Sequence, residues 1–417
     1  INGNVNADNG NGTAVEIDGN GNPSNGTVSI EGTVLASDTS YVRFVNGVRA
    51  KSEGVLNGAY LKYTDSIDGE KAGIVRIKKE NAVCTIGTQE FTTLTKALAA
   101  ANSGDTITFL QTITHTTQIQ VEGITVNLDL GNHDLLLDTS ANEAFGPALM
   151  VRDGGKIKLV GTGTGEFHVK GRSGISAIGV GVEVTVHTVE AEDGSGVYMY
   201  GSGDFLESNS TVTVLGSDAA GKNSITVGNG TGVSVNAKNG KVFVTGNIAS
   251  GRGGVFIASN PGTQATVNGN ITVTSDSLTA NLVGIRAYGA TTVTVTGDVS
   301  VQGSECLGIH ASASTIKVGG NVASSGMGAQ SDAKGKVEIT GSLSAGIPFI
   351  VVGTTEMAAD QGAETGEGSL LYTDGANTVQ IESVGNPVPV LYTTTFQTDG
   401  NGTASASPSS ATMGTEV

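Results

Sequence analysis

Apolar and small polar residues alternate along most of this chain, in short runs separated by glycine and asparagine. One seven-residue phrase has apolar residues at its first, third and seventh positions and glycine at its fifth. It begins at Val242, Ala265, Val293, Ile316 and Val337. An alternation with a period of two predicts β-strands with one buried face, and Gly or Asn predicts the turns between them. The phrase glycines are at 246, 269, 297, 320 and 341, so the copies are 23, 28, 23 and 21 residues apart. Such a period is typical of a solenoid of stacked coils.

A second phrase, which begins with glycine and continues with alternating apolar residues, lies one strand ahead of the first. Its copies start at Gly174, Gly196, Gly232, Gly254, Gly284, Gly308 and Gly328. Together the phrases predict three short strands and three turns in each coil, which is one rung of an all-β parallel β-helix. The inward Ile, Val and Leu side chains of one rung cannot close a core, so stacking of the rungs is expected to stabilise the fold.

The position after the phrase glycine is occupied by Asn247, Asn270, Asp298, Asn321 and Ser342. Amide side chains stacked at one turn can form hydrogen bonds along the column, and Asn tolerates unusual turn backbone. Asp298 belongs to this column. We therefore interpret it as a turn residue and not as a catalytic acid.

One helix is predicted, over residues 92–101, with Thr92 or Thr93 as its N-cap, and we expect it to cover the N-terminal end of the solenoid. The text "FTTLTKALAAANSGDTITFL", followed by "ITVNLDLGNHDLLLD", resembles the first segment of pectin-lyase-like right-handed parallel β-helix domains. The resemblance and the repeats cover roughly residues 83–384. It implies a right-handed single-stranded parallel β-helix, but no single activity, because that fold serves lyases, hydrolases, adhesins and stalks alike.

The two ends of the chain predict further modules. "VSIEGTV" at 28–34 repeats the phrase, and residues 61–69 resemble residues 371–375. We therefore interpret 1–82 as the terminal coils and exit segment of a preceding β-helix-like module, and 83–388 as a parallel β-helix with its capping helix at 92–101. The text from 392 to 417 resembles the start of the divergent internalin-type B-repeat modules of bacterial surface proteins, so 389–417 is interpreted as a truncated module of that kind in a longer modular protein.

The composition of the chain limits the classes of partner that we expect. The chain carries 39 acidic and 22 basic residues, a formal charge of −17, which disfavours nucleic acid and anionic membranes as partners. The apolar runs are shorter than the roughly 20 residues of a membrane helix, so no membrane insertion is expected.

Cys84 and Cys306 are far apart without metal-ligand spacing, and we expect two free thiols. Composition and resemblance together predict a secreted or cell-surface bacterial protein.

Enzyme chemistry finds little support in the sequence. A calcium-dependent polysaccharide lyase needs clustered carboxylates beside an Arg or Lys, and no column of the repeat combines Asp or Glu with Arg. A glycoside hydrolase needs two carboxylates across a cleft; no paired-Asp motif is present, although pairs formed by the fold stay open. No catalytic residue and no cofactor are predicted.

Metal sites are also not predicted. Asp8–Gly12 and Asp18–Asn22 resemble the start of a calcium loop, but Pro23 and Ser29 replace the glycine and glutamate that an EF-hand loop requires. We interpret both segments as turns. Five histidines, His115, His133, His168, His187 and His310, lack metal-ligand spacing and are interpreted as scattered surface residues.

One outward column is the candidate binding face. Its members, with Tyr200 on the same face, are Tyr198, Phe256, Arg286, His310 and Gln330. Aromatic and hydrogen-bonding groups on a flat sheet suit an extracellular polysaccharide or a host-surface glycan or protein, while a plain solvated face is the alternative. We expect a non-catalytic adhesin stalk or spacer. A polysaccharide-binding module is the alternative, and a polysaccharide lyase or glycoside hydrolase ranks behind both.

Overall fold

The computed structural model describes most of residues 81–382 and parts of the segment before it. The gaps in 81–382 are 142–145, 204–205, 219–221, 259, 276–280, 304, 347 and 366–367. Elsewhere the described residues are 5–6, 13, 15–17, 27–31, 34–37, 39–44, 47–57, 60–64, 74–78, 392–393 and 410–411. The chain divides into two compact units, Ile1–Ala82 and Val83–Val417, and each is described by itself.

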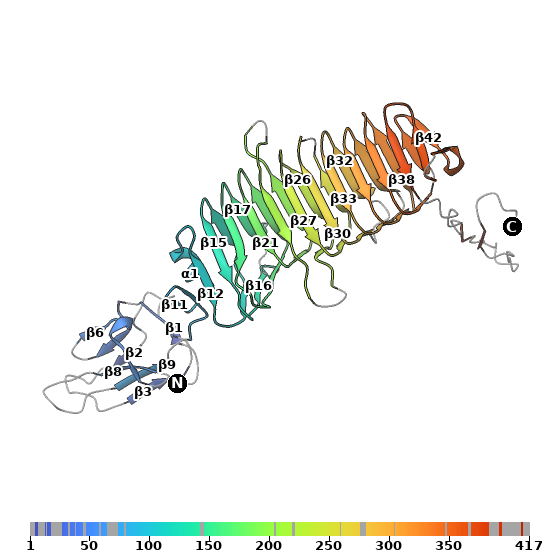
Figure 1. Ribbon diagram of the computed structural model, residues 1–417. Coiled ribbons are helices and arrows are strands. Elements are labelled where there is room, and N and C mark those ends of the chain that lie inside the picture. The colour runs from blue at the N-terminus through green and yellow to red at the C-terminus, as the bar shows by residue number, and fades with distance from the viewer. Residues whose placement is uncertain are drawn as a thin grey trace, which may run out of the picture. The chain divides into compact units, whose positions relative to one another are not determined.

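The second unit is an all-β parallel β-helix, as the repeats predict. Each coil contributes one strand to each of three long sheets, and the coils follow one another along the solenoid in chain order (Figure 1). The 15-stranded sheet has the order β11 (Gln89–Phe91), β10 (Cys84–Ile86), β12 (Thr106–Phe109), β15 (Thr125–Asp129), β18 (Lys156–Val160), β21 (Glu183–Val186), β24 (Thr211–Val214), β27 (Lys241–Thr245), β30 (Gln264–Asn268), β33 (Thr292–Val295), β36 (Thr315–Val318), β39 (Lys336–Ile339), β45 (Thr378–Ile381), β44 (Leu370–Thr373) and β43 (Ala363–Glu364).

The other two sheets are built in the same way. The 10-stranded sheet has the order β13 (Ile113–His115), β16 (Leu135–Asp138), β19 (Phe167–Gly171), β22 (Thr188–Ala191), β25 (Ile225–Val227), β28 (Ile248–Ser250), β31 (Ile271–Thr274), β34 (Val299–Gln302), β37 (Val322–Ser324) and β40 (Leu343–Ala345). The 11-stranded sheet has the order β14 (Ile119–Glu122), β17 (Pro147–Arg152), β20 (Ser173–Ile178), β23 (Val197–Tyr200), β26 (Thr231–Asn236), β29 (Gly253–Ile257), β32 (Asn281–Tyr288), β35 (Glu305–Ser312), β38 (Met327–Asp332), β41 (Ile350–Val352) and β42 (Thr355–Met357).

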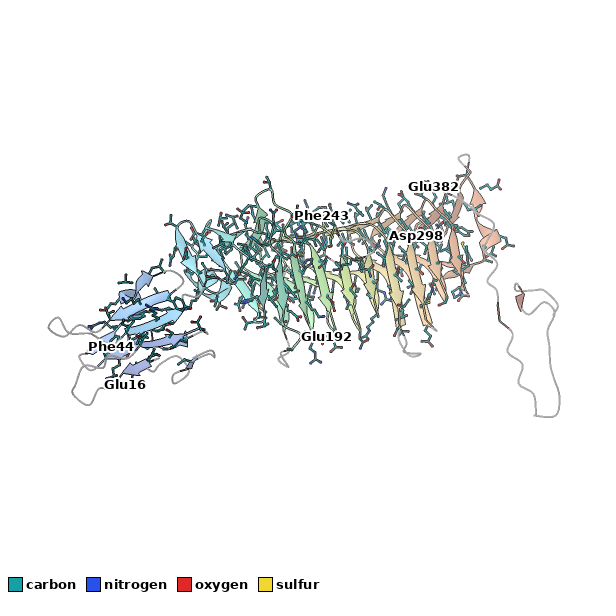
Figure 2. All side chains as sticks on the ribbon, turned by 90° about the horizontal axis from the view of Figure 1, so that it is seen from below. Glu16, Phe44, Glu192, Phe243, Asp298 and Glu382 are labelled. Atoms are coloured by element: carbon teal, nitrogen blue, oxygen red, sulfur yellow. The ribbon has the colours of Figure 1, made fainter. Side chains whose placement is uncertain are left out.

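The core is a ladder of inward apolar side chains between the sheets. Val244 pairs with Val267, and Val267 with Val295, in successive strands of the 15-stranded sheet, and each is about 1% exposed. The polar residues between them face outward, and Phe243 is 38% exposed there (Figure 2). Burying a Val or Ile side chain contributes about 1.5–3 kcal/mol, so each added coil extends the core with its own apolar set.

The glycine that opens the second phrase is required by close packing. At Gly254 a Cβ atom would overlap Cγ2 of Ile271 and the carbonyl oxygen of Gly284, which is the corresponding glycine of the next coil. Gly196, Gly232 and Gly308 have the same surroundings, an apolar side chain of the 10-stranded sheet and a glycine carbonyl one coil on. The repeated glycines therefore let the 11-stranded and 10-stranded sheets approach each other.

The turn column forms a continuous hydrogen-bonded ladder. The backbone amide of Asn270 donates to Oδ1 of Asn247 (2.9 Å), and that of Asp298 donates to Oδ1 of Asn270 (2.8 Å). The amides of Asn321 and Ser342 continue the series, at 2.7 and 2.9 Å. Asp298, labelled in Figure 2, is exposed and is a ladder member, which confirms the interpretation that it is a turn residue.

Helix α1 (Leu94–Ala100) is shorter than the predicted 92–101. Thr93 is the N-cap, because its side-chain oxygen accepts a hydrogen bond from the Lys96 amide (3.3 Å). The helix buries Leu94 and Ala97 and contacts β10 and β11. No helix in the described part of the chain is long and apolar enough to cross a membrane.

The first unit contains three small sheets. Their orders are β1 (Val5–Asn6) beside β4 (Val34–Leu35); β2 (Val15–Ile17), β5 (Val42–Phe44) and β6 (Gly47–Arg49); and β3 (Thr27–Ile30), β9 (Ile74–Lys78), β8 (Tyr60–Thr64) and β7 (Val55–Asn57). The 3-10 helix η2 (Lys51–Glu53) precedes β7, as η3 (Ala359–Gln361) precedes β43 in the second unit.

The first unit repeats the end of the second in detail. Val28 pairs with Val75 in parallel and Val75 with Tyr63 antiparallel, and the same pairings join Val337, Val379 and Tyr372. The Tyr63 hydroxyl donates to the carbonyl oxygen of Lys51, the first residue of η2 (2.9 Å). The Tyr372 hydroxyl donates to the carbonyl oxygen of Ala359, the first residue of η3 (2.6 Å). A Cβ atom at Gly54 or Gly362 would lie 2.6 or 2.7 Å from Cζ of the corresponding tyrosine. We call this arrangement of strands, 3-10 helix and tyrosine the exit cap.

Several sequence predictions concern residues that are barely described. The segments Asp8–Gly12 and Asp18–Asn22 lie outside the described residues. Of 389–417, only β46 (Tyr392–Thr393) and β47 (Ser410–Ala411), which pair antiparallel, are described. The prediction of two free thiols is confirmed, and both Cys84 and Cys306 are buried. Burial raises the pKa of the Cys84 thiol to about 11.

Candidate functional site

The predicted outward column forms one ladder across the 11-stranded sheet. Tyr198 pairs with Ser234, which pairs with Phe256, and the same register continues through Arg286, His310 and Gln330. The inward neighbours of these residues, such as Ile285 and Ile309, are fully buried. The repeat phrase therefore assigned the facing of this column correctly.

The column is less exposed than expected. Tyr198, Phe256, Arg286 and Gln330 have intermediate exposure, and His310 is only 9% exposed, so the expectation that His310 is exposed is wrong. The reason is local packing: the His310 ring lies edge-on to Tyr288, with centroids 5.4 Å apart, and its Nε2 lies 3.0 Å from Oδ2 of Asp332. Tyr200 is the more open member, at 37% exposed.

Two aromatic groups lie along this face. The rings of Tyr198 and Tyr200 are stacked, with centroids 6.2 Å apart and an interplanar angle of 21°. Farther along, Tyr288 contacts Phe256 edge-on at 6.1 Å. Sequence reasoning missed Tyr288, which occupies the same strand position as Tyr200 in a later coil. Stacked rings beside polar groups form a surface that can accept the apolar face of a sugar ring.

Arg286 and Asp332 give this face its polar character. Nε of Arg286 is buried and has no hydrogen-bond partner among the described residues. Asp332 accepts from Gln330 at 3.3 Å as well as contacting His310. Burial of the Asp332 carboxyl opposes its ionisation, but the hydrogen bonds from Ser312, His310 and Gln330 outweigh burial and lower its pKa.

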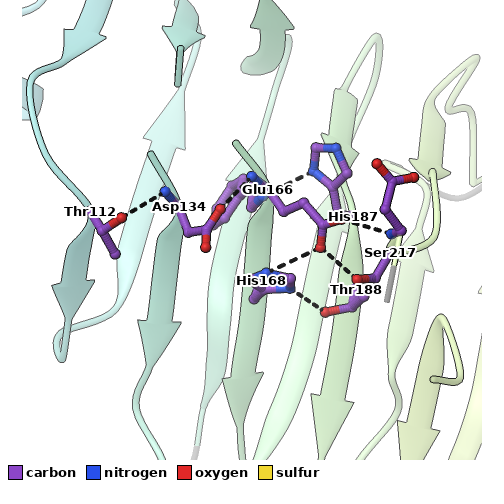
Figure 3. A network of polar contacts seen from close by, with 9 residues as sticks. Thr112, Asp134, Glu166, His168, His187, Thr188 and Ser217 are labelled. Atoms are coloured by element: carbon purple, nitrogen blue, oxygen red, sulfur yellow. Dashed lines mark hydrogen bonds and ion pairs between the residues drawn. The ribbon is translucent and has the colours of Figure 1, made fainter. Parts of the chain in front are cut away.

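A second group of polar residues, which the sequence did not predict as a site, lies around β19 of the 10-stranded sheet (Figure 3). Glu166 is at its centre, and its side chain is 14% exposed. The Ser217 hydroxyl donates to Oε2 (2.6 Å) and the Asp218 backbone amide donates to Oε1 (2.8 Å). The Glu166 amide in turn donates to Oδ1 of Asp134 (2.9 Å) in the preceding coil. Glu166 therefore joins residues of several coils.

Two histidines flank Glu166. Nε2 of His168 lies 3.3 Å from Oε2 of Glu166, and its Nδ1 lies 2.8 Å from the hydroxyl of Thr188 in the next coil. Nδ1 of His187 accepts the backbone amide of Phe167 at 2.9 Å. An accepting nitrogen carries no proton, so this contact favours the neutral His187 ring with its proton on Nε2.

The titration of this network follows from these contacts. Burial of the Glu166 carboxyl favours its neutral form, but the hydrogen bonds from Ser217 and Asp218 and the nearby His168 and His187 together lower its pKa. Burial lowers the pKa of His187, and the attraction of Glu166 opposes this only in part. Near neutral pH the network therefore holds an ionised carboxylate beside a neutral His187.

A pocket of about 550 Å³ opens beside the network, over the 10-stranded sheet. Its lining includes Thr112, Asp134, His168 and Thr188 of the network. Residues of neighbouring strands and turns complete the lining: Thr114, Leu136, Val169, Lys170, Val189, Glu190, Lys222, Asn223 and Thr226. Lys170 and Glu190 form an ion pair at 3.0 Å.

The network has a defined chemical capacity. A hydroxyl, an imidazole and a carboxylate follow one another in Thr188, His168 and Glu166, an order that can activate a hydroxyl as a nucleophile. Both Glu166 oxygens, however, also accept hydrogen bonds from the 217–218 turn. The carboxylate therefore also acts as a structural link between coils. Among the described residues, no cluster of three or more His, Cys, Asp or Glu side chains is arranged to hold a metal ion.

The prediction that all five histidines are scattered surface residues is wrong. His115 and His310 are buried, each 9% exposed, and His168 and His187 are brought together with Glu166. Residues one coil apart become neighbours in a β-helix, and His168 is 20 residues from Thr188, its partner in β22. That spacing of one coil is a signal in the sequence for the contact between His168 and Thr188, but not for the contact of Glu166 with Ser217.

In comparisons with known proteins, no family model, no curated protein and no solved structure matches this chain. The function of this chain is therefore inferred from its geometry.

Proposed function

We propose that this chain is a non-catalytic part of a secreted or cell-surface bacterial protein, in which stacked coils act as a stiff spacer or adhesin stalk. The observation that carries the proposal is the exit cap, which occurs in both units with the same strand pairings and the same tyrosine contact. A solenoid needs an end that covers its core and strand edges. Repetition of such an end along one chain is the organisation of modules in series.

The sequence resemblances agree with this proposal. The pectin-lyase-like segment supports a right-handed β-helix, and the B-repeat-like text at 392–417 supports the context of a modular surface protein. A solenoid grows in one direction by adding coils, each about 4.8 Å thick. Its length therefore increases with the number of coils, as a spacer requires. The acidic composition, with a net charge of −17, suits a protein that resists self-association.

Stiffness is the property to test. Spin labels at Lys158 in β18 and Lys317 in β36, introduced as cysteines, are six strand positions apart in the 15-stranded sheet. We expect one narrow distance distribution near 29 Å by double electron–electron resonance, from six steps of about 4.8 Å. A broad or multiple distribution would contradict a stiff spacer. The unsubstituted chain, treated with the same spin label, is the control for labelling of the buried Cys84 and Cys306.

Non-catalytic character is tested separately. Polygalacturonate, neutral polysaccharides and a simple aryl acetate are incubated with the chain, and unsaturated products, reducing ends and released phenol are measured. We expect no turnover above buffer. Activity that disappears in Thr188→Val or His168→Asn would overturn the proposal and assign a nucleophile to the network.

Glycan binding by the 11-stranded sheet is the second candidate, because the stacked pair Tyr198 and Tyr200 lies on an outward face and Tyr200 is 37% exposed. Its test is a glycan array with the unsubstituted chain and with Tyr198→Ala/Tyr200→Ala. Binding that requires the two rings supports an adhesive face. An array without signals leaves the spacer as the function.

A further inference from the structure

We propose that the pocket over the 10-stranded sheet is a binding site for a neutral, hydroxyl-rich glycan chain. The site is separate from the predicted column on the 11-stranded sheet, shares no residue with it, and goes beyond the spacer function. Its volume, about 550 Å³, is within the range of ordinary small-ligand sites.

The pocket presents hydroxyl groups from several strands of one sheet. Thr114, Thr188 and Thr226 come from β13, β22 and β25 of the same sheet, and all three line the pocket. The strand order from β13 to β25 spans four steps, roughly 19 Å at about 4.8 Å per step. A linear polymer can offer similar hydroxyl groups to successive coils along that distance.

The charges favour a neutral ligand. Of the charged lining side chains, Lys170 and Glu190 neutralise each other in an ion pair (3.0 Å). Lys222 and Asp134 add one charge of each sign to the lining, and the Glu166 carboxylate lies 3.3 Å from Nε2 of His168. The pocket therefore has no excess positive charge, and the chain as a whole carries −17. A polyuronate or sulfated glycan would be repelled, whereas sugar hydroxyls can both donate to carboxylates and accept from ammonium groups.

The network beside the pocket holds its walls in place. Glu166 fixes the Ser217–Asp218 turn through two hydrogen bonds, and this turn precedes Lys222 and Asn223 of the lining. His168 fixes the Thr188 hydroxyl (2.8 Å). Side chains that are ordered before binding lose less conformational entropy when a ligand arrives, which favours binding at a shallow polar site.

The test uses the full chain and a panel of defined probes. Cellohexaose, xylohexaose, mannohexaose and laminarihexaose are the neutral probes, oligogalacturonate is the acidic probe, and a glucosamine hexamer is the cationic probe. Affinities are measured by isothermal titration calorimetry. We expect at least one neutral probe to bind, and to bind more tightly than the acidic and cationic probes.

Substitutions locate the site. Thr114→Val/Thr226→Val removes two exposed pocket hydroxyls without changing side-chain shape, and should weaken binding of the neutral probe about tenfold or more. The matched control is Thr213→Val/Thr294→Val on the 15-stranded sheet, which should leave the affinity unchanged. Asn223→Ala is an independent pocket variant should the first pair unfold. Three outcomes overturn the proposal: no neutral probe binds, the acidic or cationic probe binds more tightly, or the pocket variants bind as well as the control.

Discussion

Asn321 donates both its backbone amide and its side-chain amide to one oxygen of Asp298, Oδ1, at 2.7 and 3.2 Å. The Asp298 amide donates in turn to Oδ1 of Asn270 in the preceding coil (2.8 Å). Asn270, Asp298 and Asn321 each accept a hydrogen bond from the next coil and donate one to the previous coil. The ladder explains why an aspartate can replace an asparagine here, since the contact that matters is made by Oδ1.

Asp298→Asn should leave stability nearly unchanged, whereas Asp298→Ala should lower the free energy of unfolding by about 1 kcal/mol. Alanine removes the acceptor of the Asn321 amide, while asparagine keeps an oxygen at the same place. Urea denaturation followed by circular dichroism measures both variants. Equal losses in the two variants would show that the charge, and not the acceptor, is what stabilises this turn.

Gly254→Ala should destabilise the second unit by about 1–3 kcal/mol, because the added Cβ overlaps Ile271 and the Gly284 carbonyl in the interior. The control is Gly146→Ala, where the nearest atom to an added Cβ is Nε2 of Gln118 at 3.5 Å, an ordinary contact. The urea midpoints of the two variants are compared. A midpoint for Gly254→Ala that matches the control would refute the close-packing role of the second-phrase glycines.

Tyr63→Phe and Tyr372→Phe should have parallel effects if the exit cap is the same structure in both units. Each change leaves a carbonyl oxygen, of Lys51 or Ala359, without the tyrosine hydroxyl, a cost of about 1 kcal/mol. Hydrogen–deuterium exchange should increase around η2 in the first variant and around η3 in the second. Tyr200→Phe, whose ring is 37% exposed, is the control and should change neither. An increase at only one of the two 3-10 helices would argue against equivalent caps.

Stability of the second unit should fall on acidification in two steps. The folded-state pKa of His187 lies below its ordinary value of 6.5, so the stability that its neutral ring contributes is complete above pH 6.5 and is lost as the pH falls through the lowered pKa. Glu166, whose pKa lies below 4.5, contributes stability above pH 4.5 that is lost at lower pH.

His187→Asn tests the first step, since the Asn oxygen can accept the Phe167 amide but does not titrate. Urea midpoints are measured from pH 7.5 to 4. The unsubstituted chain should lose stability as the pH falls below 6.5, and the variant should lose less stability over the same range. The same slope in both would assign the first step to another group.

The repeat phrases were sufficient to predict the fold of the second unit because they specify the inward and outward positions directly. The register Tyr198–Ser234–Phe256 and the role of Asp298 follow from the period alone. The exposure of His310 was not predictable in this way, because it depends on how Tyr288 and Asp332 pack against the ring. The helix boundary differed by two residues at its start because Thr93 is the cap.

The sequence by itself determined the coil, its strands, its turns and the side chains that form the core, since each follows from local alternation and from glycines at fixed spacing. Only the tertiary structure decided which polar residues meet. Glu166 and His168 are two residues apart, but Thr188 is 20 and Ser217 is 51 residues away from its partner in the network, and they become neighbours because successive coils stack on one another. The pocket exists for the same reason: its lining comes from five coils, and the contact between coils is set by stacking and not by any one segment.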